Sequence, residues 1–516
     1  MTQWFNTAGP CRADIHYMLP PTERLPGVKK LIAQQGYFVI HAPRQIGKST
    51  AMIALGHELT ASGEYTAIMV SAEVGAAFPR DIGKAERAIL SSWRGACEAW
   101  LPEDLQPPEW PKTDDGRQIG AALNRWAQTS PRPLVVFIDE IDALQDDVLV
   151  GILRQLRDGY VKRPYGFPHS LALIGLRDVR DYKVASGGSS RLGTASPFNI
   201  KVESLTLRNF TAPEVAQLYQ QHTDATGQIF DPEVLEEAYE LSQGQPWLVN
   251  ALAREMTQKL VEDVSQPITL SHLKQAKENL IQRNDTHLDS LTERLREPRI
   301  RAIIEPMLAG QPLGDIPRDD REFAIDLGLL RRHPAGGLVI ANPIYREVLP
   351  RMLASGPQDS LPLIAPTWLD DQGQLIPDAL LDAFLKFWRQ HGQPLLGSAP
   401  YHEIAPHLVM MAFLHRVVNG GGTLNREYAI GTDRMDLCLE YGAVTIGIEL
   451  KVWRDGRPDP LKAGLEQLDG YLAGLNVDWG WLVIFDRRAG LPDICDRTTT
   501  AAAVTENERQ ITVIRG

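Results

Sequence analysis

The chain has 516 residues, of which 43% are hydrophobic and 23% charged, which is enough apolar material for true cores and excludes a disordered chain. At roughly 100–200 residues per domain, this length suggests about three or four domains. The formal net charge of −12 excludes a protein that coats nucleic acid nonspecifically, so any contact with nucleic acid must be local.

Cysteine usage and the N-terminus predict the compartment. The four cysteines lie far apart without a CxxC pair, which fits neither a disulfide framework nor a zinc site. The N-terminal stretch MTQWFNTAGP has no basic region followed by an apolar core, and no run approaches the ~18–20 apolar residues of a membrane span. We therefore expect a cytoplasmic protein without a membrane segment.

The first 200 residues alternate short apolar runs with helical stretches, as βαβ units do. The runs at 36–42, 66–70, 134–138 and 171–176 have the length of buried parallel strands. From about residue 205 the pattern becomes helical, and Thr211-Ala-Pro-Glu214 has the form of a capping box. These features predict a parallel α/β sheet followed by a helical segment.

Residues 299–352 show two helical patterns and then a short hairpin around Gly336-Gly337, which is the order of a winged helix. Arg331, Arg332 and Arg346 could bind DNA there, and a structural lever between domains is an equally open interpretation. The segment 354–366 is rich in Pro, Ser and Gly and predicts a linker before a final α/β domain.

A phosphate-binding loop follows the first predicted strand. It has the Walker A spacing, with alanine in place of the first glycine, over Ala42, Pro43, Arg44, Gln45, Ile46, Gly47, Lys48, Ser49 and the following Thr50. Successive backbone N–H groups at the start of a helix cradle phosphate oxygens. Gly47 permits an unusual backbone torsion, Lys48 would reach the β- and γ-phosphates, and Ser49 would ligate Mg²⁺.

The predicted strand at 134–138 ends in two carboxylates, Asp139 and Glu140. Asp139 would hold Mg²⁺ through water, and Glu140 would polarise the attacking water. An apolar run followed by Asp-Glu is a weak signal by itself. It becomes a strong signal when it follows a Walker loop with a strand between them.

These motifs resemble the AAA-like and STAND group of prokaryotic P-loop ATPases, over roughly residues 10–350. The resemblance implies ATP and Mg²⁺ as cofactors. It also implies that Arg177, at the end of the fourth strand, senses the γ-phosphate and that Pro246, in the segment SQGQP, lies near the adenine. Arg24 matches the arginine of a segment that covers the base.

A carboxylate hairpin is the most informative segment near the C-terminus. Two strands with period-2 alternation flank Gly442-Ala443, and a two-residue loop with glycine first suits a type II′ turn. This loop pairs Tyr441 with Val444 and therefore places Asp436 opposite Glu449. Lys451 then stands two residues along on the same face.

Two carboxylates on one face repel each other unless a cation lies between them. Mg²⁺ or Mn²⁺ held by Asp436 and Glu449 would polarise a phosphodiester and lower the pKa of a bound water. Lys451 would orient that water or stabilise developing charge. The alternative is a solvated polar face on a half-exposed hairpin.

The surrounding order strengthens the metal-site interpretation. An amphipathic helix at 402–418 precedes the hairpin, a helix that starts after Asp459-Pro460 follows it, and a strand covers 481–485. Together with the motifs GTDRMDL, ELK and QLDGYL, this order resembles the PD-(D/E)xK nuclease superfamily, over roughly residues 380–500.

That resemblance implies metal ligands at Asp436 and Glu449 and a catalytic lysine at Lys451. It further implies an accessory helix glutamate at Glu403 and an active-site glutamine at Gln467. The proline of the family's PD element is replaced by methionine.

We therefore expect an α/β protein with a P-loop sheet, a helical lid, a winged-helix-like segment and a PD-(D/E)xK-like domain. The predicted divisions are residues 1–204, 205–295, 296–353, a linker at 354–366, and 367–516.

The function expected first is a Mg²⁺-dependent nuclease that cuts nucleic acid, expected to be DNA, under ATPase control, in anti-phage defence or mobile-element biology. The alternative is a STAND-type nucleotide switch whose nuclease-like domain binds DNA or a protein without cutting. A motor ranks last because no helicase motif accompanies the Walker pair. We expect a homo-oligomer, and a protein partner is left open.

Overall fold

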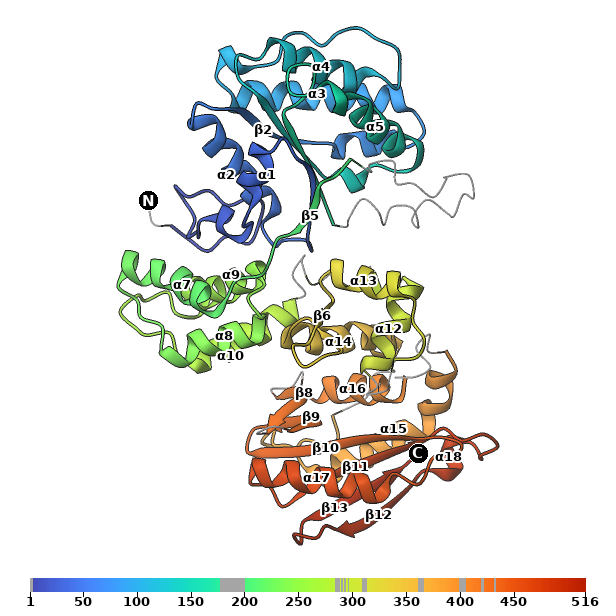
Figure 1. Ribbon diagram of the computed structural model, residues 1–516. Helices are drawn as coiled ribbons and strands as arrows, with labels where there is room; N and C mark the ends of the chain where they lie inside the picture. Colours follow the sequence, from blue (N-terminus) through green and yellow to red (C-terminus); the bar gives the residue numbers. More distant parts are fainter. Residues whose placement is uncertain are drawn as a thin grey trace. The chain divides into compact units, whose positions relative to one another are not determined.

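The computed structural model describes residues 3–176, 200–283, 288, 291, 294–295, 297–308, 313–360, 366–398, 405–418, 422–430 and 433–516. The chain forms two compact units, shown in Figure 1. The first contains Met1–His287 with Pro317–Pro343, and the second contains Leu288–Ile316 with Ile344–Gly516. Among the described residues, no helix is both long enough and apolar enough to cross a membrane.

A five-stranded parallel sheet in the order β2-β3-β4-β1-β5 forms the centre of the first unit. Its strands are β1 (Tyr37–His41), β2 (Thr66–Ser71), β3 (Leu134–Asp139), β4 (Ser170–Gly175) and β5 (Glu203–Thr206). The first four confirm the predicted runs. Strand β5 escaped prediction because its sequence, ESLT, is short, polar and only partly buried at the sheet edge.

Helices cover both faces of this sheet (Figure 1). They are α1 (Val28–Ala33), α2 (Lys48–Ala61), α3 (Ile82–Trp100), α4 (Gln118–Thr129) and α5 (Asp146–Gly159). Because side chains alternate along a strand, Phe38 and Ile40 pack against α1 and α2, whereas Tyr37 and Val39 pack against the core of α3, α4 and α5.

The helical segment that follows consists of α7 (Ala212–Thr226), α8 (Pro232–Ser242), α9 (Pro246–Glu255) and α10 (Leu270–Arg283). The predicted capping box is confirmed: the Thr211 side chain accepts from the Glu214 amide, and the Glu214 carboxylate accepts from the Thr211 amide. A single π-helical turn, Met256–Leu260, follows α9.

The winged-helix-like segment has the predicted element order. Its elements are α12 (Pro298–Leu308), α13 (Arg318–Asp326), β6 (Leu330–Arg332), β7 (Leu338–Ile340) and α14 (Pro343–Ser360). The hairpin turns at Gly336 and Gly337, whose φ values are 100° and 83°. The two compact units divide this segment, because α13 and the hairpin belong to the first unit whereas α12 and α14 belong to the second.

Helix α14 continues to Ser360, so the first part of the predicted linker is helical rather than irregular. Its early turns bury Ile344, Tyr345 and Val348. A helix nucleated by such burial extends at little further cost, because each added residue gains one hydrogen bond.

The second unit contains a six-stranded mixed sheet in the order β12-β13-β11-β10-β9-β8. The strands are β8 (Thr423–Ile430), β9 (Asp433–Tyr441), β10 (Val444–Trp453), β11 (Trp479–Asp486), β12 (Thr499–Val504) and β13 (Gln510–Arg515). Strands β10, β11 and β13 are parallel neighbours, and the remaining pairs are antiparallel.

The helices of this unit are α15 (Pro377–Ser398), α16 (Ala405–Val418), α17 (Leu461–Leu475) and α18 (Ile494–Arg497). Helix α17 packs through Leu468 and Leu472 on the face that carries Cys438 and Leu482. Trp388 of α15 packs against Phe485, which alternation places on the opposite face.

Helix α16 differs from the expected amphipathic helix at 402–418. Its described part starts at Ala405 and is almost entirely buried, because it packs against α15, β8 and β9. A helix that is apolar on all sides is typical of an interior position.

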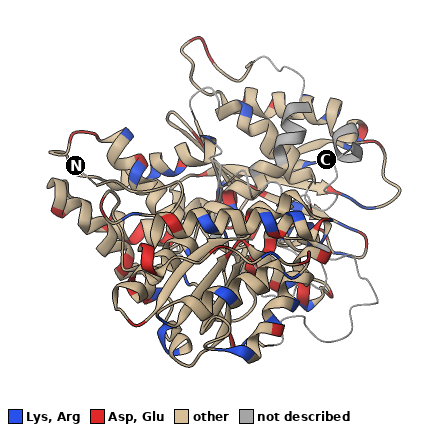
Figure 2. Ribbon diagram, turned by 90° about the horizontal axis from the view of Figure 1, so that it is seen from above, with Lys and Arg blue, Asp and Glu red and all other residues tan. Residues whose placement is uncertain are grey.

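Acidic and basic residues are interspersed along the helices (Figure 2). The excess of acidic residues is therefore spread over the chain rather than concentrated in one acidic segment.

Gly480 allows β11 to pass close to β10, which yields a stability prediction. A Cβ at this position would lie 2.7 Å from the Gly447 carbonyl oxygen and 3.2 Å from the Leu472 side chain. Gly480→Ala should therefore lower the free energy of unfolding of the second unit by about 1–3 kcal/mol, as overpacking does. Urea unfolding monitored by tryptophan fluorescence measures this loss.

Gly470→Ala is the matched control. Gly470 lies on the exposed side of α17, and no described neighbouring atom lies within 4 Å of a Cβ there. This substitution should keep or raise stability by up to ~1 kcal/mol through helix propensity. Equal losses in both variants would contradict the close approach of the two strands.

Candidate functional site

The loop between β1 and α2 has the geometry of a phosphate-binding loop. Gly47 is the N-cap of α2 with a φ of 97°, and Gln45 has a φ of 58°, so the loop turns through two left-handed positions. The Ser49 hydroxyl donates to Asp139 Oδ2 at the end of β3, over 2.6 Å. With this sheet order, the loop has the geometry that is typical of P-loop NTPase domains.

Lys48 folds back over its own loop. Its Nζ donates to the carbonyl oxygens of Ala42 and Pro43 at 2.8 and 2.9 Å. The ammonium is thus held at the loop, where an incoming phosphate would replace backbone carbonyls as its partners.

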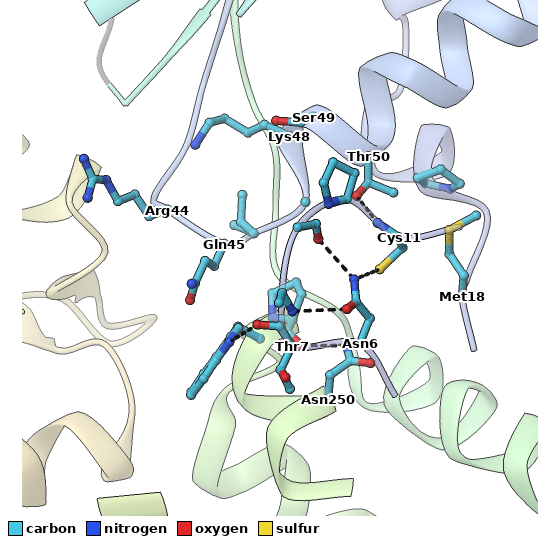
Figure 3. Close-up of a pocket in the computed structure, with 18 of the residues that line it drawn as sticks. Asn6, Thr7, Cys11, Met18, Arg44, Gln45, Lys48, Ser49, Thr50 and Asn250 are labelled. Carbon is cyan, nitrogen blue, oxygen red and sulfur yellow. Dashed lines mark hydrogen bonds between the residues drawn. The ribbon is translucent and has the colours of Figure 1, made fainter. Parts of the chain in front are cut away.

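A cavity of about 460 Å³ adjoins the loop (Figure 3). This volume is within the usual range for ligand pockets. Its walls include the predicted residues Arg44, Gln45, Ile46, Gly47, Lys48, Ser49, Thr50, Glu140 and Pro246. Pro246 opens α9, so the predicted lid residue and the P-loop lie on one cavity.

The two carboxylates at the end of β3 are arranged differently. Asp139 is buried and accepts from the Ser49 hydroxyl and from the Glu140 amide, the latter over 2.9 Å. Glu140 has a φ of 53° and lines the cavity. Burial raises the pKa of the Glu140 carboxyl, and repulsion from Asp139 and Asp142 adds to this rise.

Leu176, which follows β4, lies beside this group of carboxylates. The Leu176 amide donates to Asp142 Oδ2 over 3.0 Å, and Leu176 lines the cavity. Arg177, the predicted γ-phosphate sensor, is the next residue and lies outside the described residues.

The N-terminal segment also lines the cavity, which the sequence did not predict. Figure 3 shows Lys48 and Ser49 at one end of the cavity and Asn6 and Thr7 at the other. Thr7 accepts from α9 at two atoms: its carbonyl oxygen from Trp247 Nε1 at 2.9 Å, and its hydroxyl from Arg254 Nη1 at 2.6 Å.

The same segment reaches α2, since the Cys11 amide donates to the Thr50 hydroxyl over 3.0 Å. These contacts join residues far apart in sequence, and no local motif signals them. The N-terminal segment therefore connects α2 to α9 around the cavity.

The Arg24 side chain contacts the P-loop and the segment that precedes α7. Its Nη1 donates to the carbonyl oxygens of Ile46 and Arg208 at 2.9 and 3.0 Å, and its Cζ lies 4.7 Å from the centre of the Phe210 ring. Burial lowers the pKa of the Arg24 guanidinium to about 10, so it stays charged at neutral pH. Its role in covering a base stays a prediction.

The carboxylate hairpin has the predicted register. Val444 pairs with Tyr441, and the antiparallel ladder continues to Ile448 opposite Leu437. Gly442 has a φ of 57°, which suits the first central position of a type II′ turn. This ladder ends one position before Asp436 and Glu449, and the Leu450 amide donates to Asp436 Oδ2.

Glu449 is buried, with 3% of its surface exposed, so the hairpin is not a solvated face at this position. Its Oε1 accepts from Lys451 Nζ at 2.5 Å, and Asp436 Oδ2 accepts from the Leu450 amide at 2.9 Å. Burial and repulsion from Asp436 together raise the pKa of the Glu449 carboxyl to about 7, although the Lys451 ammonium lowers it.

A hard divalent cation fits this arrangement. Glu449 Oε2 is buried without a hydrogen-bond partner in the described part of the chain, which is costly unless a cation or water satisfies it. No cluster of three or more His, Cys, Asp or Glu that could hold a metal occurs among the described residues. Asp436 and Glu449 would therefore supply two carboxylates, and waters the other positions, as is usual for Mg²⁺.

The two accessory residues are not joined to this pair. Glu403 lies outside the described residues. Gln467 is exposed on α17 and makes no hydrogen bond to Asp436, Glu449 or Lys451 in the described structure. Its assignment to the site stays a prediction.

No family model matches the chain, and no curated protein matches it. Solved structures similar to it include the Walker-type ATPase PABY2304 of Pyrococcus abyssi, at 14% identity and a TM-score of 0.47, over 67% of this chain and 99% of that one. The Aeropyrum pernix ORC2 protein is 12% identical with a TM-score of 0.40, over 67% and 95%.

The Thermotoga maritima RuvB Holliday junction branch migration motor is 14% identical with a TM-score of 0.33, over 62% of this chain and 90% of that one. At such scores these likenesses carry no argument about function. The P-loop fold is assigned from the sheet order and the loop itself.

The raised pKa of Glu449 predicts a pH-dependent stability. The pKa of about 7 in the folded state exceeds the ~4.3 of an unfolded glutamate, so the folded form holds an extra proton between these values. Stability therefore falls as pH rises through this window. In EDTA, Glu449→Gln should raise the melting temperature of the second unit, relative to the parent, more at about pH 8 than at about pH 4.5.

Differential scanning calorimetry at the two pH values measures this difference. Glu440→Gln is the control, because Glu440 lies on the same hairpin and is more exposed than Glu449. A gain in Glu449→Gln that is the same at both pH values would contradict the buried, repelled carboxylate.

Proposed function

We propose that the first unit binds and hydrolyses ATP in the cavity beside the P-loop. The observation behind this is the contact between Ser49 and Asp139, with Lys48 held at the same loop. Mg²⁺, when bound, would neutralise phosphate charge beside the Ser49 hydroxyl and Asp139. Glu140 faces the cavity with a raised pKa, as suits a group that accepts a proton from the attacking water.

The cavity walls suggest where the rest of the nucleotide lies. Pro246 lines this cavity, and Asn6 and Thr7 of the N-terminal segment lie at the end away from Lys48, where the adenine would bind. Arg177 is proposed as the γ-phosphate sensor because it follows Leu176, which already lines the cavity.

The second unit is proposed to be a metal-dependent nuclease that cuts nucleic acid, in particular DNA. The observation that carries this proposal is the buried Glu449, which is bonded to Lys451 and repelled by the nearby Asp436, and whose Oε2 lacks a hydrogen-bond partner among the described residues. Mg²⁺ or Mn²⁺, when bound, would polarise the phosphodiester and lower the pKa of a bound water. Asp436 and Glu449 hold that cation, and the Lys451 ammonium orients the water and stabilises charge on the phosphate.

The two activities are proposed to be coupled in a cytoplasmic homo-oligomer, with ATP controlling access to DNA. Anti-phage defence or mobile-element biology is the setting that this combination suggests. A nucleotide switch whose second unit binds DNA or a protein without cutting is the second candidate. Gln467 is exposed on α17 and makes no hydrogen bond to Asp436, Glu449 or Lys451 among the described residues, which favours this second candidate.

Variants of the P-loop test the ATPase. Lys48→Ala should abolish binding of a fluorescent ATP analogue, because the main cationic contact to the phosphates is lost. Glu140→Gln should bind it as the parent does and lose turnover by about 10²-fold or more, the usual contribution of a general base. Lys29→Ala, at an exposed lysine of α1, is the control and should behave as the parent does. Undiminished binding by Lys48→Ala would refute the assigned loop.

Variants of the hairpin test the nuclease on plasmid, linear and single-stranded DNA and on RNA, with Mg²⁺ or Mn²⁺ and with or without ATP. Asp436→Ala and Glu449→Ala should lose both cleavage and Mn²⁺ binding in calorimetry, because each removes a ligand. Lys451→Ala should keep metal binding and lose about 10²-fold in rate.

Lys386→Ala is the control for these variants, because Lys386 is exposed on α15, which packs on the other face of the sheet. Cleavage by Glu449→Ala at the parent's rate would show that the activity belongs to a contaminant. Binding of DNA by the parent without cleavage under any condition would favour the switch.

A further inference from the structure

The carboxyl ends of three parallel strands meet beside the carboxylate pair. In their registers, Lys451 of β10 pairs with Ile484 of β11, and Ile484 pairs with Arg515 of β13. Trp453 stands two residues after Lys451, so it lies on the same face. Glu449, Lys451, Trp453 and Arg515 therefore share one face of the sheet, and ligands of parallel sheets bind beyond such strand ends.

Two guanidinium groups lie against Trp453 at this edge. The Cζ of Arg488 is 3.5 Å from the centre of the Trp453 ring, and the Cζ of Arg515 is 5.5 Å from it. Both distances suit cation–π contact. We call Trp453, Arg488 and Arg515 the arginine edge.

Each guanidinium forms an ion pair with an aspartate and keeps N–H donors that are not used in that pair. Arg488 Nη2 pairs with Asp486 at 2.7 Å, and Arg515 Nη2 pairs with Asp459 at 2.7 Å. Nη1 of both arginines makes no hydrogen bond within the described residues, and about a third of each side chain is exposed. Fixed, partly exposed guanidinium groups with free N–H donors match the oxygens of a phosphate.

The surrounding loops are tied together and carry more cations than carboxylates. The Arg487 amide donates to the Trp453 carbonyl oxygen over 2.8 Å, and the Ala489 amide donates to Asp455 Oδ2 over 3.0 Å. The charged residues of the segments 454–460 and 486–489 and of the end of β13 are Arg454, Arg457, Arg487, Arg488 and Arg515, against Asp455, Asp459 and Asp486, while the neighbouring Lys451 is paired with Glu449. In a chain with a net charge of −12, this local excess of positive charge points to an anionic partner.

We propose that the arginine edge binds backbone phosphates of the nucleic-acid strand that is cut at Glu449 and Lys451. This inference rests on the proposed nuclease function. Two residues along a strand span roughly 7 Å, so a strand with its scissile phosphate at Lys451 passes over Trp453. Arg488 and Arg515 contact phosphate, and Trp453 is a positioning residue that orients both guanidinium planes.

The test measures binding of fluorescein-labelled duplex and single-stranded DNA to the full chain by anisotropy, in EDTA, over a range of salt concentrations. Arg488→Ala and Arg515→Ala should each weaken binding about tenfold, as expected when a hydrogen bond to a charged group is lost. Each should also reduce the slope of log K against log salt by about 1, because one phosphate contact disappears.

Trp453→Phe should keep most of the affinity, because it retains an aromatic face, whereas Trp453→Ala should weaken binding as the arginine variants do. Lys386→Ala, at an exposed lysine of α15, removes one positive charge elsewhere and should leave affinity and salt slope unchanged. Thermal melting of every variant separates loss of contact from loss of fold.

The outcomes separate this inference from the proposed nuclease. If the parent binds and cuts DNA while Arg488→Ala and Arg515→Ala keep its affinity and salt slope, the arginine edge is refuted and the nuclease stands. If the parent binds DNA without cutting and both variants bind weakly, the arginine edge stands and the nuclease is refuted. A parent that neither binds nor cuts DNA overturns both.

Discussion

A buried carboxylate costs free energy unless a cation or hydrogen bonds compensate it, and this constraint governs the second unit. Glu449 lies at 3% exposure beside Asp436, and within the described part of the chain only one of its oxygens accepts a hydrogen bond, from Lys451. The strand order around it keeps the pair in place, because β10 is bordered by β9 on one side and β11 on the other. A buried carboxylate that is only partly compensated, in the middle of a sheet, is typical of a functional site.

The first unit meets a related constraint in another way. Asp139 is also buried at the end of a parallel strand, but both of its oxygens accept hydrogen bonds, from Ser49 and from the Glu140 amide. Its charge is therefore compensated by the loop that precedes α2. Glu140, the neighbour with the raised pKa, is the group left facing the cavity.

The cationic groups of the two units also differ in their partners. Lys48 is held by backbone carbonyls, which a phosphate can replace without leaving a charge unpaired. Arg488 and Arg515 are held by carboxylates and by an aromatic ring, so they stay oriented whether or not an anion is bound. Preorganised cations of this kind lose little conformational entropy on binding.

Local patterns in the sequence determined the elements and the hairpin register. The four apolar runs became β1 to β4, the capping box at Thr211 opens α7, and the Gly442-Ala443 turn pairs Tyr441 with Val444. These succeed because alternation, turn chemistry and capping act over a few residues. Strand β5 and the helical end of α14 were not predicted, because their local composition is typical of loops. Pairing with β1 makes the first a strand, and continuation of α14 makes the second helical.

Tertiary structure alone decided which distant segments meet. Nothing near Thr7 indicates that it bonds to Trp247 and Arg254, or that the N-terminal segment lines the cavity beside the P-loop. Equally, nothing local places Arg515 beside Trp453, since their proximity follows from the order β10-β11-β13. Local sequence sets the backbone and the face on which each side chain lies, whereas contacts between distant segments depend on how whole elements pack.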